Sequence, residues 1–400
     1  MTAYLLLAAM AWAGATRGGT DARDLVIVFV LVAASVATAQ ARPSAGLGPW
    51  AASGVLLAYL IVNGPLRRGW SLDSVRMPLL ILIVAMALLA VAGMNASDRE
   101  VLTAGLIILG TLQAVIALVA VIVSAVSGGV DLSVPPRGEG LLGFPNGLGV
   151  LLVGTSILTL RQLIRGRRRA VAGMALIVQV TAILATGSRI AILIMGILIV
   201  VTVVVRSATV RGRREAGLAA WPRPAGYVLA VCATVAGVAM VAWRTVVEPN
   251  EDRPQLWVEA MQRIAAAPLF GEGAPAKAFE LVSESSRVTT SAHNEILQWT
   301  LEYGLVGVGL AGAVILLALR GTRPWSRGDR WALVAAAALL ASGLTGFSPR
   351  ITVVALAAVV LVGLGASPAP EGLRDRPPLP PARLRRRAVD RSRRARPDPR

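Results

Sequence analysis

The sequence has very little of the side-chain chemistry on which most metal and redox sites depend. Its 400 residues include one cysteine, Cys232, and one histidine, His293. A single cysteine cannot form a disulfide within the chain, and because Cys232 lies inside an apolar run we interpret it as a core residue. One histidine and one buried cysteine make no plausible cage for a transition metal, so we expect no metal site and no cofactor.

Charged residues are scarce and of one predominant sign. They make up 16% of the chain, and 40 basic residues against 22 acidic ones give a net charge of +18. Such a charge can indicate a nucleic-acid partner, but here the arginines lie in short loops between apolar runs and in a terminal tail, without interleaved aromatic residues. This placement is typical of membrane topology, and we predict no nucleic-acid partner.

Apolar sequence is abundant. Hydrophobic residues make up 55% of the chain, its mean hydropathy is +0.67, and many runs are long enough to cross a hydrocarbon core of about 30 Å. The chain is therefore predicted to be all-α, a polytopic integral membrane protein of about twelve transmembrane helices in one domain over residues 1–366. The predicted spans are 3–16, 25–41, 48–63, 78–94, 101–127, 143–160, 170–186, 188–205, 225–247, 293–319, 331–347 and 350–366.

Arginine-rich loops predict the orientation of the chain in the membrane. The loops 161–169, 206–224 and 320–330 each carry a cluster of arginines, which places them in the cytoplasm. The segment 367–400 is rich in proline and arginine and has almost nothing apolar to bury, so it is predicted to be a disordered basic cytoplasmic tail. We interpret it as a topological anchor, and contact with anionic membrane lipid is the alternative. Three arginines fall on the outer side against this rule: Arg67, Arg68 and Arg76.

Counting crossings from these loops places three unusual segments on the same side of the membrane. One crossing separates the cytoplasmic loop 161–169 from the segment 143–147 before it and from the turn 186–189 after it. One crossing from the loop 206–224 likewise leads to the polar segment 248–292. All three segments are therefore predicted to lie at the extracytoplasmic face.

The large extracytoplasmic loop 248–292 contains a short amphipathic helix over 254–266, with apolar residues at helical spacing. Arg253 falls at the amino-terminal end of this helix, where the helix dipole attracts phosphate. A guanidinium at this position can hold a diphosphate through two parallel hydrogen bonds. The alternative is a simple ion pair of Arg253 with Glu251 or Asp252.

Arg189 lies in an outer turn of only a few residues, where positive charge opposes the usual topological bias. We interpret it as a second anion-binding group, directed into a cavity under the outer loop. The alternative is that its side chain reaches the lipid head groups.

His293 opens a long apolar helix, with Ser291 or Asn294 available as a cap. The positive end of the helix dipole disfavours the imidazolium ion and keeps the ring neutral near pH 7, the form that a general base needs. A single histidine at a membrane interface is more often structural than catalytic. Its coincidence with two outer arginines favours catalysis.

Further along the same helix, Glu302 is predicted to be a structural partner inside the bundle. Four glycines in this helix are interpreted as packing residues that permit close approach of helices: Gly304, Gly307, Gly309 and Gly312.

Several short motifs carry a family resemblance over about residues 140 to 310. They are His293-Asn294 followed by nine residues and Gly304-x-x-Gly307, Arg253-x-x-x-Trp257, Pro268-Leu269-Phe270-Gly271-x-Gly273, Gly187-Ser188-Arg189 and Phe144-Pro145-Asn146. In their order along the chain, and with all of them predicted at one face of the membrane, these motifs resemble the O-antigen ligase and O-antigen polymerase family of polyprenyl-linked glycan enzymes.

The resemblance implies a metal-independent membrane glycosyltransferase. It would move a glycan from undecaprenyl pyrophosphate to an acceptor hydroxyl, on a lipid or on another glycan, at the outer face of the cytoplasmic membrane. His293 would deprotonate the hydroxyl, while Arg189 and Arg253 would bind the diphosphate. Ligases and polysaccharide polymerases of the family remain alternatives, and so does a transporter without catalysis. Weaker candidates for substrate binding are Asn146, Asn294, Trp257 and Lys277.

Overall fold

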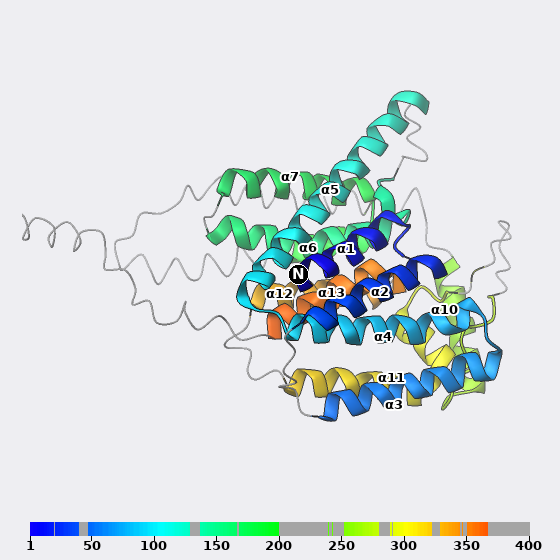
Figure 1. Cartoon of the computed structure of the whole chain (residues 1–400). Helices are drawn as coiled ribbons and strands as arrows, with labels where there is room; N and C mark the ends of the chain where they lie inside the picture. Colours follow the sequence, from blue (N-terminus) through cyan, green and yellow to red (C-terminus); the bar gives the residue numbers. More distant parts are fainter. Residues whose placement is uncertain are drawn as a thin grey trace, which may run out of the picture. The chain divides into compact units, whose positions relative to one another are not determined.

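The apolar runs form helices in the computed structural model of the chain (Figure 1). A helix satisfies its own backbone hydrogen bonds, which is a requirement for chain segments in a hydrocarbon core. The structure describes residues 1–19, 21–39, 47–128, 137–165, 168–199, 239, 242, 252–279, 289, 291–321, 329–344, 346 and 350–366.

The described elements are all helical, apart from one isolated antiparallel bridge between Phe279 and Thr289. The all-α prediction is therefore confirmed for this part of the chain. The helices are α1 (Thr2–Ala15), α2 (Ala22–Thr38), α3 (Leu47–Ile61), α4 (Leu72–Ala92), α5 (Ala96–Gly128), α6 (Pro145–Arg165), α7 (Arg169–Thr186), the helix Arg189–Ile199, α10 (Asp252–Ala266), α11 (Glu295–Gly321), α12 (Arg330–Ala341) and α13 (Thr352–Ala366), with the short turns η1 (Val62–Leu66), η2 (Gly140–Leu142) and η3 (Ser342–Leu344).

Five of the described helices, α4, α5, α6, α7 and α11, are long and apolar enough to cross a membrane. Several other apolar helices are shorter, among them α1, α12 and α13. The predicted count of twelve spans stays a prediction, because the span predicted at 225–247 lies almost entirely outside the described residues. The contacts divide the chain into Met1–Ser367 and Pro368–Arg400, a boundary one residue after the start of the predicted tail 367–400. The tail lies outside the described part.

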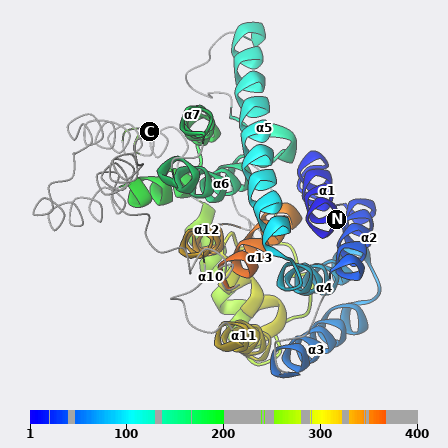
Figure 2. The ribbon, with the colours of Figure 1, turned by 60° about the vertical axis from the view of Figure 1, so that its left-hand side comes forward.

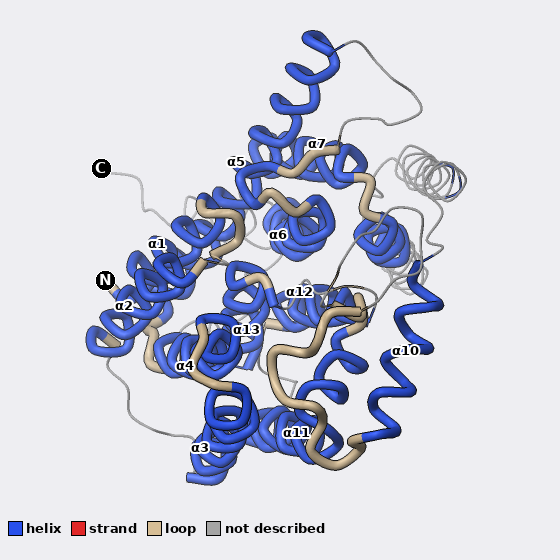
Figure 3. The backbone as a smooth tube through the Cα atoms, turned by 90° about the vertical axis from the view of Figure 1, so that its right-hand side faces the viewer, coloured by secondary structure: helices blue, strands red, loops and turns tan. Residues whose placement is uncertain are grey.

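Successive helices run up and down the bundle, so their connections gather at two ends (Figures 1 and 2). At one end the amino group of Met1 pairs with Asp98 at 3.5 Å, and Arg161 pairs with Asp329. We call this the opposite end. At the other end lie the segments 62–71, 137–144, 186–188, 267–279 and 291–294, and we call it the site end (Figure 3). Arg350 belongs to this end, because its carbonyl accepts a hydrogen bond from Arg76 near the start of α4.

Hydrogen bonds between distant segments hold the loops of the site end together. The Thr352 hydroxyl donates to the Gly19 carbonyl at 2.8 Å, and the Gly138 amide donates to the Ala185 carbonyl at 2.9 Å. Arg76 donates to the carbonyl of Arg350 at 3.3 Å. These bonds join the start of α13 to the loop after α1, the end of α7 to the segment before α6, and α4 to the segment before α13.

Buried apolar side chains form three clusters. The largest joins α1, α2, α4, α5, α6, α7, α12 and α13, while a second one joins α3, α4 and α11. The third lies under α10 and contains Leu256, Ala260, Phe279, Ala292 and Leu301. This third cluster fixes α10 against the loop that leads to His293.

Two of the three arginines that broke the topological rule, Arg67 and Arg76, have structural partners at the site end. Arg67 donates to the side chain of Asn63 at 3.0 Å and to the carbonyl of Gly271 at 2.9 Å. Arg76 bonds the Arg350 carbonyl, as noted above. These contacts hold loops in place, which is a physical reason for basic residues at this end irrespective of the orientation rule.

Candidate active site

The structure brings together the three residues predicted to carry the chemistry. The Arg253 guanidinium lies close enough to His293 and to Arg189 for its charge to interact with both. These residues come from α10, from the turn before α11 and from the helix Arg189–Ile199. Segments that lie about 100 residues apart in the chain thus meet at one place.

Arg189 is placed by a tight turn after α7. Gly187 ends α7 with a φ of +61°, a conformation that glycine adopts without strain. Ser188 is fully buried, and its hydroxyl accepts the amide of Ala191 at 3.4 Å. Gly149 of α6 lies against this turn, where a Cβ atom would lie 3.0 Å from Ser188. The close packing of α6 fixes the point from which the Arg189 side chain leaves.

Arg253 lies in the first turn of α10, as predicted. Leu256 and Ala260 are buried beneath this helix, so the face that includes Arg253 is turned toward the bundle. Burial lowers the pKa of the Arg253 guanidinium, and the nearby charge of Arg189 lowers it further. Arginine nevertheless stays protonated in proteins, so two cations lie near one another. Such a pair of like charges favours a bound anion between them.

His293 lies in a turn of residues 291–294, which we call the histidine turn. Asn294 caps α11, because its side-chain oxygen accepts the amide of Leu297 at 3.1 Å. Ser291 bonds the turn before the helix, since its hydroxyl accepts the amide of His293 at 3.2 Å. Of the two predicted caps, Asn294 is the one that caps the helix.

The environment of His293 favours the neutral imidazole. Burial lowers the pKa of His293 below its ordinary value of 6.5, and the charge of Arg253 lowers it further. The backbone of His293 has a φ of +51°, a left-handed conformation that costs a residue with a Cβ atom about 1 to 3 kcal/mol. Strain of this kind is typical of functional positions.

A third arginine lies at the same face and was missed in the sequence. Arg137 donates to the carbonyl of Thr186 at 3.1 Å and to the side chain of Asn146 at 3.1 Å. It thereby connects the start of α6 to the turn that carries Arg189. Arg137 precedes the predicted span 143–160 and therefore falls on the predicted outer side of the membrane. A basic residue on that side could have identified it as a candidate from the sequence.

The loop 267–273 fits into a break in α11. Gly304 has a φ of +65°, and the helix is interrupted there. The amides of Leu305 and Val306 donate to the carbonyls of Pro268 and Leu269 at 2.9 and 3.1 Å, while the amides of Glu272 and Gly273 donate to α11 carbonyls. The loop therefore supplies partners to backbone groups that the break releases.

This break corrects the interpretation of the glycines in α11 as uniform packing residues. A Cβ atom on Gly304 would collide with the backbone of Leu269 and Phe270, so this glycine permits approach of a loop. A Cβ on Gly307 would come within 3.1 Å of Tyr59, which fits the packing interpretation. Gly309 and Gly312 have no atom within 4 Å of such a Cβ, so neither permits a close approach among the described residues.

A buried ionic cluster lies directly behind the histidine turn. Arg350 donates to both oxygens of Glu295 at 2.9 and 3.1 Å and to both oxygens of Glu302 at 3.0 and 3.2 Å. Gln298 donates to Glu302 at 2.7 Å. Glu302 is thus the structural partner that the sequence predicted. Its cation, Arg350, was missed, although a carboxylate inside a predicted span requires such a partner.

The weaker candidates for substrate binding have contacts with the protein itself. Asn146 accepts Arg137 and Asn294 caps α11, as described above. The indole of Trp257 donates to the carbonyl of Ala292 at 3.0 Å. Lys277 has an exposed side chain, and its backbone bonds Arg263 and Glu272. Their roles toward a substrate stay predictions.

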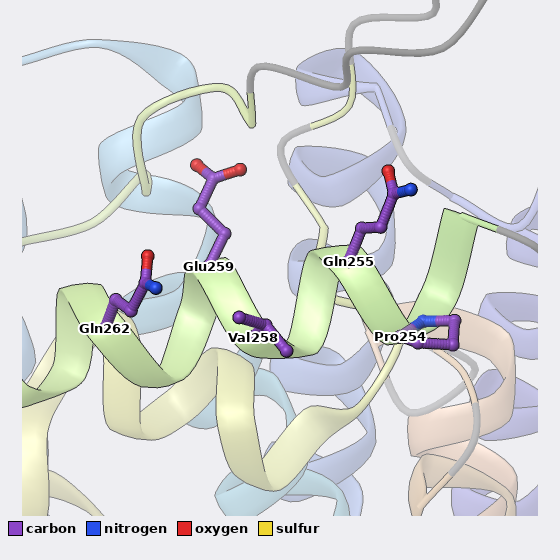
Figure 4. A pocket seen from close by; sticks show the side chains of 5 residues that line it. All are labelled: Pro254, Gln255, Val258, Glu259 and Gln262. Carbon is purple, nitrogen blue, oxygen red and sulfur yellow. The ribbon is translucent and has the colours of Figure 1, made fainter.

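A shallow, open hollow of about 440 Å³ lies on the outward face of α10, away from Arg253. Its lining includes the polar side chains of Gln255, Glu259 and Gln262 (Figure 4). This hollow does not contain the three predicted catalytic residues. In the described part of the chain, no group of three His, Cys, Asp or Glu side chains is placed to hold a metal ion.

Comparison with known proteins agrees with the resemblance seen in the motifs. Residues 174–312 match the family model described as O-Antigen ligase, and this segment includes Arg189, Arg253 and His293. No curated protein matches the chain. The match over residues 174–312 covers about a third of the chain, and this segment is similar to the O-antigen ligase family. The five long apolar helices described above agree with a multi-pass membrane protein.

Proposed function

We propose that the protein transfers a glycan from undecaprenyl pyrophosphate to the hydroxyl group of a lipid or glycan acceptor, at the extracytoplasmic face of the cytoplasmic membrane. The observation that carries this proposal is that the guanidinium group of Arg253 lies near both Arg189 and His293, whose pKa is lowered by burial and by Arg253. A base beside an anion-binding pair matches the needs of a reaction in which a hydroxyl attacks and a diphosphate leaves.

The reaction needs one proton transfer and one displacement. The acceptor oxygen forms a bond to the anomeric carbon of the glycan, and the bond from that carbon to the diphosphate oxygen breaks. The diphosphate leaves with the bonding electrons, and a nitrogen of His293 takes the proton of the acceptor hydroxyl. Arg189 and Arg253 neutralise the charge that grows on the leaving group, so that it departs without a metal ion.

A transporter without catalysis is the second candidate, and the break in α11 is the observation that favours it. Interrupted helices and buried charges, such as Gly304 and the Arg350 cluster, are typical of transporters. In this protein the loop 267–273 bonds backbone groups at the break. That contact favours a rigid site over a moving gate.

The test is a transfer assay with the full chain purified into nanodiscs. A polyprenyl-diphosphate-linked glycan is added with either a lipid acceptor or a second glycan. We expect a new glycan–acceptor bond and one free polyprenyl diphosphate for each bond formed. Extension of the lipid acceptor identifies a ligase, and extension of the glycan identifies a polymerase. Movement of the donor across a sealed bilayer without new bonds would support the transporter.

A further inference from the structure

We propose that Gln298 and Trp257 are positioning residues that hold the histidine turn, and with it the imidazole of His293, in its left-handed conformation. This inference rests on the proposed function, since it assigns residues that orient the base. The observation behind it is that side chains from α11 and α10 bond the backbone of Ala292 from two sides.

The first contact comes from α11. The Gln298 side-chain oxygen accepts the amide of Ala292 at 2.7 Å, and its nitrogen donates to Glu302 at 2.7 Å. Because a backbone amide must donate and a carboxylate accepts, these partners fix which way the Gln298 amide points. Ala292 is fully buried and Gln298 is 3% exposed, so water does not replace either contact.

The second contact comes from α10. The Trp257 indole donates to the carbonyl of Ala292 at 3.0 Å, while the amide of His293 in the same peptide unit donates to Ser291. Both polar groups of the peptide that enters His293 are therefore bonded. A φ of +51° at a residue with a Cβ atom persists only where the surroundings determine it in this way.

The ionic cluster extends this support into the bundle. Glu302, which orients Gln298, is itself held by Arg350, and Arg350 also bonds Glu295. A chain of contacts thus runs from the start of α13 through Arg350, Glu302 and Gln298 to the peptide before His293. The base is anchored to the transmembrane helices although it lies in a loop.

The charged groups around the imidazole are divided between two sides. Arg253 approaches from α10, with Arg189 beside it, and Glu295 behind the turn is paired with Arg350. A turn that loosens changes the burial of the imidazole and its distance to Arg253, the two causes of its lowered pKa. Positioning can therefore be measured apart from catalysis.

The experiment uses the fact that the chain has one histidine. The full chain, with isotope-labelled histidine and an affinity tag that contains none, gives a single imidazole to titrate by nuclear magnetic resonance in nanodiscs. Gln298→Met keeps the length of the side chain and removes both hydrogen bonds. We expect the pKa of His293 to move toward 6.5 and kcat for transfer to fall about 10-fold to 100-fold, with KM little changed.

Two further variants control for general loosening of the structure. Thr300→Val removes a buried hydroxyl of α11 that bonds the carbonyl of Ile296 in its own helix, and it should behave as wild type. Trp257→Phe keeps an aromatic ring on the half-exposed α10 and removes the indole donor. It should change the pKa and kcat in the same direction, by a smaller factor, and it serves as the test if Gln298→Met does not fold.

The outcomes separate this inference from the proposed function. Wild-type titration of His293 in both Gln298→Met and Trp257→Phe would overturn the positioning role, even if transfer were impaired. An equal change in Thr300→Val would overturn it too, because loosening of α11 would then explain the effect. A shifted pKa with unchanged kcat would uphold positioning and contradict His293 as the base.

Discussion

Arginines at the two ends of the bundle are used in different ways. At the opposite end most described arginines are exposed, as for Arg165, Arg168, Arg169 and Arg330. At the site end several are half-buried: Arg76, Arg137, Arg189, Arg253 and Arg350. An exposed cation keeps its hydration, whereas a half-buried one loses part of it, and neighbours or a ligand must offset that loss. Half-buried arginines are thus more frequent at the site end, although Arg99 and Arg161 at the opposite end are half-buried as well.

The largest effect predicted from this comparison is the orientation of the two ends. In a Cys232→Ser background, a cysteine replacing the exposed Lys277 should react with an impermeant maleimide in right-side-out vesicles. A cysteine replacing the exposed Arg165 should react only after the membrane is breached. The measurement is the labelled fraction of each variant, and the reverse pattern would place the site in the cytoplasm.

The second prediction concerns the break that shapes the site end of α11. Gly304→Ala places a Cβ at a φ of +65° and against the backbone of Leu269. We expect a loss of about 2 to 5 kcal/mol from the left-handed conformation and the collision together. Gly309→Ala, in the same helix with open space around it, should be neutral or slightly stabilising. Thermal unfolding in nanodiscs checks both, and equal midpoints would mean that α11 is continuous.

The third prediction tests whether half-buried arginines bind the diphosphate. Arg189→Lys and Arg253→Lys keep the charge but lose the planar, two-pronged geometry. If each loses about 2 to 3 kcal/mol of transition-state stabilisation, transfer falls about 30-fold to 160-fold. Arg165→Lys at the opposite end is the matched control and should keep the wild-type rate. Near-normal transfer by both single variants at the site end would remove the diphosphate contact from the mechanism.

The fourth and smallest effect is on the pH profile. Because burial and Arg253 lower the pKa of His293, the neutral base predominates at pH 7 and is lost as the pH falls through the lowered pKa. The rate should then fall about tenfold per pH unit. Added chelator should leave the profile unchanged. A rate that rises as the pH falls would contradict a neutral imidazole as the base.

Much of the fold and the outline of the site follow from the sequence. Apolar runs predict the helices, and counting crossings from arginine-rich loops predicts that Arg189, Arg253 and His293 share one face. The helix over 254–266 and the cap at Asn294 follow from local periodicity and side-chain type. These features depend on residues that are close in sequence, or on the fact that successive transmembrane helices place their connecting loops on alternate sides of the membrane.

Features that depend on tertiary contacts could not be predicted from the sequence. The sequence does not distinguish the four glycines of α11 from one another. Gly304 differs because the backbone of the loop 267–273 packs against it, which only the tertiary structure shows. His293 has a left-handed φ, and the side chains that bond the backbone of Ala292 before it, Trp257 and Gln298, come from two helices that no local pattern connects. Arg350 stands beside a proline between two apolar runs, and its two carboxylate partners lie about 50 residues earlier.

The most direct test of the central claim is transfer by His293→Ala in the nanodisc assay. If His293 is the base, the rate should fall about 100-fold to 10,000-fold while membrane abundance stays normal. His293→Gln, which keeps a polar group but cannot take the proton, should lose nearly as much. Full transfer by His293→Ala would contradict the account, because the site end would then hold a histidine that takes no part in the reaction.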